Sequence, residues 1–289
     1  MPTLLRRNNS ATVSRPNEKG RIVQHYDVAS PYYRSLWGDH IHHGYWIRGD
    51  ESKEEAQLQL TEHLANLAHL AHLPSGAEIL DIGCGFGGSS IHLAQKYAAR
   101  VTGITISPVQ IEMAREAAAA SHANARFLLM DAEALNFQHS FDLFWSIESI
   151  SHYYDRRAFF LNAIRFLKPG GVFALTDWFK RPGLSSLQSR KFIQPIERGM
   201  FVELDTMDDY ASYLAAAGLE IIHRQDVSAN CAKTWDLTSE IIRDRSLWAL
   251  AATKGKDFLT YLNAFRAMRA GYRSGAFVYG LFVARKHLV

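Results

Sequence analysis

Long hydrophobic runs are absent from this chain of 289 residues. None approaches the roughly 18 apolar residues that a membrane-spanning helix needs, and no secretory hydrophobic segment is present. Cysteine is scarce as well: Cys84 and Cys231 fit neither a disulfide framework nor a zinc cluster. We therefore expect a cytoplasmic protein in a reducing compartment, without a membrane span.

An excess of charge of one sign is also missing. The 32 Lys and Arg residues nearly balance 29 Asp and Glu, so the net charge of +3 gives no electrostatic case for nucleic-acid binding. The tract Asp39–His43 is rich in histidine, but adjacent histidines point apart and no further ligand is evident nearby, so we expect no metal. The expected partner is a small molecule, and the sequence leaves a homo-oligomer open.

A glycine-rich corner organises the chain. An apolar run ends at Asp81, glycines follow at positions 83, 85, 87 and 88, and an amphipathic segment comes next, which predicts a strand, a tight turn and a helix. Glycine permits positive φ and lets a ligand approach the backbone, while the start of the helix favours negative charge. We therefore expect the main ligand to contact Asp81, Gly83 and Gly85.

The same glycines fit two cofactor patterns. Gly83, Gly85 and Gly88 satisfy the dinucleotide fingerprint G-x-G-x-x-G, which is a weak signal by itself. A dinucleotide site normally adds an acid about 20 residues on, at the end of the second strand. The predicted second strand, Arg100–Ser107, ends without one. An NAD-dependent oxidoreductase is therefore the distant alternative.

The motif Asp81-x-Gly83-x-Gly85-x-Gly87 resembles motif I of the class I S-adenosylmethionine (AdoMet) methyltransferases. With Gly103–Gln110 and Trp37–Trp46, it is similar to the γ-tocopherol methyltransferase group and related small-molecule natural-product methyltransferases. The resemblance implies an α/β fold: a Rossmann-like, seven-stranded, mostly parallel sheet with helices on both faces and a helical cap or lid. It also implies the strand order three-two-one-four-five-seven-six, with the seventh strand antiparallel.

Five segments are expected along the chain. The first is basic and rich in hydroxyl groups up to Arg15, which is typical of a disordered tail, with a targeting role as the alternative. The expected segments are a flexible tail (1–18), an N-terminal helical lid (19–72), an AdoMet-binding core (73–178), a cap insertion (179–217), and a C-terminal part of the core with helical cap elements (218–289).

The second and third strands supply candidate cofactor ligands. Ser107-Pro108 reads as the start of a helix, so Gln110 lies in its first turn beside Thr105, and both can reach the ribose hydroxyls. The third strand ends at Asp131, whose carboxylate can accept the adenine amino hydrogens. The alternative role for Asp131 is a helix N-cap.

Two further ligands follow from the resemblance. It places Tyr26 near the cofactor sulfonium and the acceptor, and it places His42 in a turn that closes over the methionine end of the cofactor. The alternatives are a core aromatic for Tyr26 and a surface polar residue for His42. The expected cofactor-binding residues are Tyr26, His42, Asp81, Gly83, Gly85, Thr105, Gln110, Asp131, Ala132 and Ile147.

The fourth and fifth strands should deliver the catalytic groups. Glu148 and His152 follow the fourth strand, and Asp177 ends the fifth, so in a doubly wound sheet all three face the same crevice. His152 has a suitable unperturbed pKa for a general base, Asp177 could orient it, and Glu148 is the alternative proton acceptor. The competing interpretation is a structural histidine.

These features predict an AdoMet-dependent methyltransferase that releases S-adenosylhomocysteine (AdoHcy). The expected acceptor is small and largely apolar: a phenolic, prenylated or polycyclic natural product methylated on oxygen or carbon. The alternatives are an N-methyltransferase of a small amine or alkaloid, an isoprenoid C-methyltransferase, and a non-catalytic binding protein with the same fold.

Overall fold

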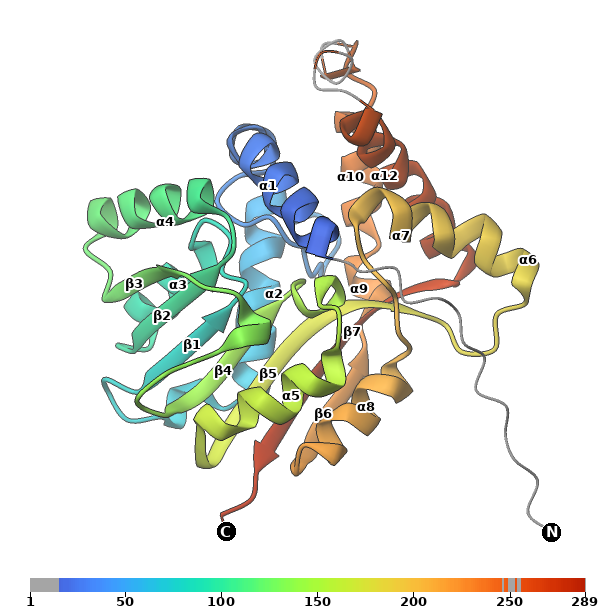
Figure 1. Cartoon of the computed structure of the whole chain (residues 1–289). Helices are drawn as coiled ribbons and strands as arrows, with labels where there is room; N and C mark the ends of the chain where they lie inside the picture. The colour runs from blue at the N-terminus through green and yellow to red at the C-terminus, as the bar shows by residue number, and fades with distance from the viewer. Residues whose placement is uncertain (1–15, 246, 249–252, 254–255, 289) are drawn as a thin grey trace, which may run out of the picture.

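The computed structural model describes residues 16–245, 247–248, 253 and 256–288. The strands are β1 Glu78–Ile82, β2 Arg100–Thr105, β3 Ala125–Leu129, β4 Phe141–Ile147, β5 Leu167–Lys180, β6 Leu219–Asp226 and β7 Phe277–Lys286. The α-helices are α1 Pro16–Trp37, α2 Lys53–Leu67, α3 Gly88–Lys96, α4 Pro108–Ser121, α5 Arg156–Ala163, α6 Ser186–Gln188, α7 Gln194–Met200, α8 Met207–Ala216, α9 Ser228–Cys231, α10 Lys233–Ile241 and α12 Lys256–Ser274 (Figure 1). The expected tail lies, up to residue 15, outside the described residues, and α1 begins at Pro16. None of the described helices combines the length and the apolar character that a bilayer crossing needs.

The strands form one seven-stranded sheet in the order β3-β2-β1-β4-β5-β7-β6. The strands from β1 to β5 pair in parallel, and β7 runs antiparallel to both β5 and β6. The predicted fold and strand order are confirmed. Because β1 lies between β2 and β4, the chain changes direction across the sheet there, and the carboxyl ends of β1 and β4 flank the crevice where such sheets bind ligands.

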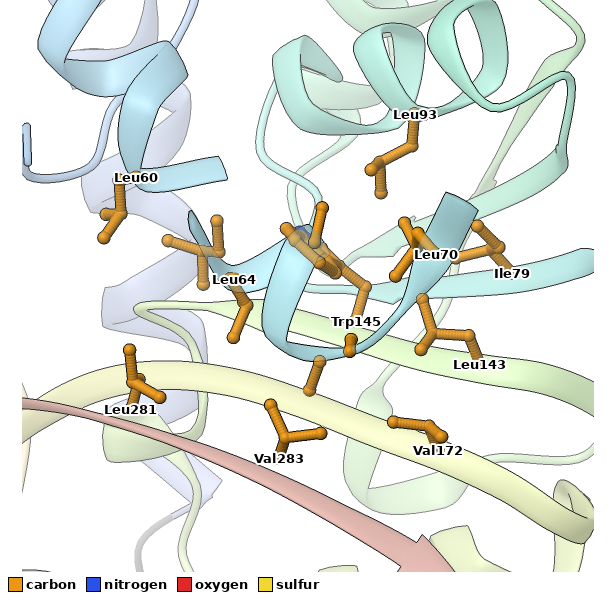
Figure 2. Close-up of a cluster of buried hydrophobic side chains, with 14 of the residues drawn as sticks. Leu60, Leu64, Leu70, Ile79, Leu93, Leu143, Trp145, Val172, Leu281 and Val283 are labelled. Carbon is orange, nitrogen blue, oxygen red and sulfur yellow. The ribbon is translucent and has the colours of Figure 1, made fainter. Parts of the chain in front are cut away.

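One face of the sheet is covered by α2 and α3. Leu60 and Leu64 of α2 pack with Leu93 of α3 around Trp145 of β4, as Figure 2 shows. Both α2 leucines are fully buried, so α2 belongs to the core. The lid expected over 19–72 is therefore too long, because α2 packs into the core of the sheet.

The opposite face is covered by α5 and α8. Phe160 of α5 and Tyr210 of α8 pack with Phe173 of β5 and Phe282 of β7. Since α8 buries Tyr210 against the sheet, it belongs to the core and not to the cap insertion expected over 179–217. Helices thus cover both faces, as predicted.

A separate cap of helices lies above the sheet in Figure 1. Its apolar cluster joins α1, α7, α10 and α12, through side chains such as Ala29, Met200, Trp235, Leu262 and Met268. The cap is therefore built from three distant parts of the chain. This arrangement allows it to enclose a pocket at the edge of the sheet.

The contact between α7 and α12 gives a stability prediction. A side chain at Gly199 would place its Cβ 2.4 Å from the Cβ of Ala264, so Gly199→Val should force the two helices apart and cost roughly 1–3 kcal/mol of unfolding free energy. Urea unfolding measures the cost. The matched control is Gly20→Val, because nothing lies within 4 Å of a Cβ at that position. An equal loss in both variants would contradict the close packing of the cap.

Candidate active site

The turn after β1 can be built only from glycine at key positions. Gly83 has φ +79°, and a Cβ there would lie 2.0 Å from the hydroxyl oxygen of Ser149. The N–H groups of Gly83 and Cys84 both donate to the carbonyl of Ile104, at 2.9 and 3.0 Å, which holds the turn against β2. At Gly85, φ is +53° and the neighbour nearest to a Cβ is Ile41 at 3.3 Å, so this backbone faces the pocket.

Asp81 lies buried beneath the turn. Its carboxylate accepts a hydrogen bond from the hydroxyl of Ser90 in α3, at 2.5 Å. Burial raises the pKa of Asp81 to about 7, and the bond from Ser90 opposes the shift only in part. The group is therefore partly protonated near neutral pH.

Thr105 and Gln110 lie side by side at the end of β2, as predicted. The Thr105 hydroxyl donates to the Gln110 side-chain oxygen at 2.7 Å. Ser107 caps α4 by accepting from the Gln110 N–H at 3.1 Å, and Pro108 begins the helix. The Gln110 amide also donates to Ser30 of α1 at 3.2 Å, so this pair touches the lid.

Asp131 has two contacts at the edge of the pocket. One carboxylate oxygen accepts from the Glu133 N–H at 2.9 Å, which caps the short 3₁₀ helix Ala132–Ala134. The other lies 2.5 Å from the ammonium group of Lys19 in α1. The capping role left open by the sequence is therefore present. Lys19 also contacts Glu133 at 2.7 Å, and neither contact was predicted.

Polar contacts fix one face of α1 over the sheet edge. Besides the contacts of Lys19 and Ser30, Asp27 accepts from the hydroxyl of Ser107 at 2.5 Å. The hydroxyl of Tyr26 lies 3.0 Å from Nε2 of His152. These residues recur at helical spacing, so α1 docks as a rigid lid.

His152 has a defined tautomer in this structure. Its Nδ1 lies 3.3 Å from the carbonyl of Phe201, which can only accept, so Nδ1 carries the proton. Nε2 then accepts from the hydroxyl of Tyr26. Burial lowers the pKa of His152 to about 4, with a smaller contribution from the charge of Arg156. The imidazole is therefore neutral at pH 7, and the expectation of an unperturbed pKa is wrong, because burial makes His152 a weaker base.

The expectation that Asp177 orients His152 is wrong. One carboxylate oxygen of Asp177 accepts from the Ser151 N–H at 2.8 Å and from the Tyr210 hydroxyl at 3.0 Å, and the other accepts from the Trp178 N–H at 2.8 Å. These donors occupy both oxygens of the carboxylate, and the residue is fully buried. Asp177 therefore holds the turn that carries His152, while the Phe201 carbonyl holds the ring itself. No sequence pattern in the insertion indicated Phe201.

Glu148 has a strained backbone and several donors. Its φ is +53°, which is uncommon for a residue other than glycine. One side-chain oxygen accepts from the backbone N–H and from Nδ1 of His43, at 2.7 and 2.8 Å, and from the Tyr279 hydroxyl at 2.8 Å. Burial opposes ionisation, but the charge and hydrogen bonds of His43 outweigh it and lower the pKa of Glu148. Sequence reasoning missed Tyr279, since nothing in its strand pattern placed it at the site.

His42 is buried next to this contact. Its Nδ1 donates to the His43 carbonyl at 2.8 Å, and its Nε2 lies 3.2 Å from Nδ1 of His40. Burial lowers the pKa of His42. The alternative of a surface residue is therefore wrong. In the part of the chain that the structure describes, no three His, Cys, Asp or Glu side chains converge as a metal site.

One pocket brings the predicted residues together. Every expected cofactor-binding residue lines it, from Tyr26 in α1 to Ile147 at the end of β4, together with Glu148 and His152. Asp177 does not line it. The cap adds apolar side chains to the same pocket, namely Met200, Ile242, Leu247, Leu262, Phe265 and Met268. A polar end at the glycine turn is thus continuous with an apolar end under the cap.

Comparison with known sequences gives consistent matches. The family described as mycolic acid cyclopropane synthetase matches residues 14–277. The chain is 34% identical over 275 residues to the 27-O-demethylrifamycin SV methyltransferase of Amycolatopsis mediterranei (strain S699), covering 94% of this chain and 97% of that protein. It is 30% identical over 303 residues to the chloroplastic tocopherol O-methyltransferase of Arabidopsis thaliana, covering 96% and 85%.

Solved structures share the fold. The [4+2]-cyclase SpnF superposes with a TM-score of 0.81 at 26% identity, covering 93% of this chain and 96% of that one. The mycolic acid cyclopropane synthase CmaA1, in complex with SAH and CTAB, gives 0.82 at 24% identity, covering 92% and 98%. One of these neighbours is a cyclase, so the fold alone does not specify the reaction, which depends on the residues of the site.

The buried carboxyl of Asp81 predicts how stability depends on pH. Its pKa is about 7 in the folded chain, against 3.8 for an ordinary aspartate. Between those values the folded chain binds the extra proton, so stability falls as pH rises. Asp81→Asn removes this dependence. The difference in unfolding free energy between the variant and the wild type should rise by on the order of 2 kcal/mol, in favour of the variant, from about pH 5 to pH 7.5. Urea unfolding at both values measures it.

The control for this prediction is an exposed carboxyl. The side chain of Asp50 is 78% exposed, so Asp50→Asn should track the wild type at both pH values. If Asp81→Asn also tracks the wild type, the carboxyl is not held in its neutral form.

Proposed function

The chain belongs to the mycolic acid cyclopropane synthetase family and is a methyltransferase, and we propose that it transfers the methyl group of AdoMet to a small, largely apolar acceptor. The proposed acceptor class is a phenolic, prenylated or polycyclic natural product methylated on oxygen or carbon. The observation that carries this proposal is one pocket that has a polar end at the glycine turn and an apolar end under the cap. A cytoplasmic location and a homo-oligomeric state remain predictions.

The polar end of the pocket fits AdoMet. The backbone at Gly83 and Gly85 forms a cradle in which a side chain at position 83 would strike Ser149. Thr105 and Gln110 offer a hydroxyl and an amide for ribose hydroxyls, and Asp131 offers a carboxylate for an amino group. When bound, AdoMet supplies a methyl group already activated on a sulfonium. We assign to the same ligand four further residues that line the same pocket: Tyr26, His42, Ala132 and Ile147.

The chain's own residues then position the acceptor and exclude water. The docked α1 and the cap close the pocket, so an acceptor under them is desolvated and oriented, which is the main source of rate for an activated methyl group. His152 is neutral at pH 7, and its Nε2 has a lone pair that the Tyr26 hydroxyl uses. We propose that His152 accepts the proton of a hydroxyl acceptor, either directly or through Tyr26. Glu148, which is ionised and lines the pocket, is the second candidate.

The relatives favour oxygen as the methylated atom. The names tocopherol O-methyltransferase, 27-O-demethylrifamycin SV methyltransferase and (+)-O-methylkolavelool synthase all specify oxygen. The (+)-O-methylkolavelool synthase of Herpetosiphon aurantiacus is 31% identical over 219 residues, covering 74% of this chain and 75% of that protein. The solved structures include a geranyl diphosphate C-methyltransferase at 19% identity and a protein described as a sarcosine dimethylglycine methyltransferase at 24%, and both support the fold alone.

The cofactor assignment predicts selective binding. Titration calorimetry should show saturable binding of AdoMet and AdoHcy and none of NAD. Gly85→Val should abolish binding of AdoHcy, because a β-branched side chain strains the positive φ and fills the ligand's approach. Gly20→Val serves as the control, because Gly20 is exposed and does not line the pocket. Saturable NAD binding without a response to AdoMet or AdoHcy would overturn the proposed function.

The role of His152 predicts a separation between turnover and binding. Transfer of a deuterated methyl group from AdoMet to a panel of phenolic, prenylated and amine acceptors identifies a working acceptor by mass. With that acceptor, His152→Ala should lower turnover roughly 10²- to 10⁴-fold and leave the affinity for AdoHcy nearly unchanged. His72→Ala is the control, since His72 is exposed and does not line the pocket. Equal loss of turnover and AdoHcy affinity would indicate a structural histidine.

A further inference from the structure

The orientation of His152 depends on two segments that are far apart in the sequence. The imidazole belongs to the turn after β4, whereas the carbonyl that faces its Nδ1, at 3.3 Å, belongs to Phe201 in the insertion after β5. Phe201 follows α7 with a φ of +55°, which is uncommon for a residue other than glycine. The ring keeps this partner only while the two segments keep one relative position.

One buried guanidinium contacts both segments. Arg156 begins α5 and is only 6% exposed. Its Nη2 donates to the carbonyl of Ser151, at 2.8 Å, and to the carbonyl of Glu203. Its Nη1 lies 3.2 Å from a carboxylate oxygen of Asp205. The guanidinium therefore binds the residue that precedes His152 in the turn and two residues of the insertion.

Arginine is suited to this position. Its guanidinium is planar and permanently charged, so it binds several acceptors in a fixed geometry, and hydrogen bonds from a charged donor are stronger than neutral ones. A lysine would carry the same charge as a compact group on a flexible stem. Asp205, whose side chain is 17% exposed, supplies a compensating negative charge. Arg156 can therefore hold the carbonyls of two segments at a defined separation.

Two further contacts act on the same turn. Asp177 accepts from the Ser151 N–H at 2.8 Å, which ties the turn to β5. The Glu203 N–H donates to the Ser151 carbonyl at 3.3 Å, which joins the turn to the insertion through the backbone. Arg156 reinforces this junction with hydrogen bonds from a charged group. We therefore expect the loss of Arg156 to loosen the junction without abolishing it.

Charged groups around His152 also affect its proton. Burial lowers the pKa of His152 most, and among the neighbouring charges that of Arg156 in α5 lowers it further and that of Glu148 after β4 raises it. The Tyr26 hydroxyl of α1, which faces Nε2, stays protonated because burial raises its pKa. Asp177 of β5 faces backbone N–H groups and a tyrosine hydroxyl. Removing the charge of Arg156 should therefore raise the pKa of His152, since the imidazolium loses a repelling neighbour.

We propose that Arg156 is a positioning residue for His152. Its guanidinium fixes the turn after β4 against the insertion, which keeps the Nδ1 proton on the Phe201 carbonyl and leaves Nε2 as the nitrogen that accepts a proton. This inference rests on the proposed role of His152 in the methyltransferase reaction. Arg156 does not line the pocket, so it acts through the imidazole and not on a ligand. The proposal adds no covalent step.

The first test observes the His152 ring directly in the free protein. Nitrogen-15 spectra distinguish a protonated from an unprotonated ring nitrogen, and comparison with His152→Ala identifies the His152 signals among those of 13 histidines. At pH 7 the wild type should show one tautomer, with the proton on Nδ1. Arg156→Gln should show a mixture of the Nδ1–H and Nε2–H tautomers, because the loosened junction no longer holds the Phe201 carbonyl on Nδ1.

Two variants separate the charge of Arg156 from its geometry. Arg156→Lys keeps the charge and loses the planar fork, so the tautomers should mix while the pKa of His152 stays low. Arg156→Gln loses both, so the tautomers should mix and the pKa should rise. The double variant Arg156→Gln, Asp205→Asn leaves no unpaired carboxylate, and it should behave as Arg156→Gln does even where the single variant folds poorly.

The second test measures turnover with a working acceptor. Arg156→Gln should lower turnover roughly 10- to 10²-fold, because the base is misplaced, and leave the affinity for AdoHcy nearly unchanged. Between pH 7.5 and pH 5.5 the ratio of its turnover to that of the wild type should fall, since a base with a raised pKa is protonated sooner. Arg156→Lys should show a constant ratio. The matched control is Arg157→Gln, because this neighbouring arginine is exposed and should leave spectra and turnover as in the wild type.

The outcomes separate this inference from the proposed function. If AdoHcy fails to bind to the wild type, the methyltransferase proposal itself fails. If AdoHcy binds but the wild-type His152 is already a mixture of tautomers, the positioning role is overturned. A single Nδ1–H tautomer in both Arg156→Gln and the double variant would also overturn it. Equal losses of turnover and AdoHcy affinity with an unchanged His152 spectrum would show that Arg156 only stabilises the fold, which overturns it as well.

Discussion

The carboxylate of Glu148 joins the three parts of the molecule that make the pocket. It follows β4 at the switch point of the sheet, and it accepts from His43 in the turn after α1 and from Tyr279 in β7. Removing a partner from a buried charge of this kind is strongly destabilising, because the charge remains without compensation. The positive φ of Glu148 has a cost of about 1–3 kcal/mol that the surrounding contacts must offset. Glu148 therefore helps to fix the position of the His42-His43 turn, together with the Trp37 indole N–H, which donates to the His42 carbonyl.

The lid is held differently. Lys19 contacts Asp131 with side chains that are 40% and 35% exposed, so this ion pair is weak in water. Among the described residues, further polar contacts of α1 with the sheet edge are single hydrogen bonds through Tyr26, Asp27 and Ser30. A ligand that offers its own donors and acceptors at this edge can replace them one by one. The buried turn after α1 is held separately, by the hydrogen bonds from His43 to Glu148.

Sequence reasoning was strongest where a residue's role is local. The glycine turn, the cap of α4 at Ser107 and the placement of Thr105 beside Gln110 follow from backbone rules and spacing. The strand order came from the family resemblance and not from the pattern of residues. The error at Asp177 arose because ends of neighbouring strands share an edge, yet the direction of a side chain depends on which donors surround it, here Ser151 and Tyr210.

The helices at the boundaries between the expected segments are harder to assign from the sequence for the same reason. An amphipathic helix shows that it has an apolar face but not which surface that face meets, so α2 and α8 were assigned to the lid and the cap although both pack on the sheet. The identity of the methyl acceptor is harder still to infer from the sequence. The apolar end of the pocket is lined by Met200, Leu262 and Met268, which belong to segments with no common spacing, and each residue alone reads as an ordinary core residue. Only the fold brings these side chains together at one wall, so the shape of the apolar end follows from tertiary packing and not from any local pattern.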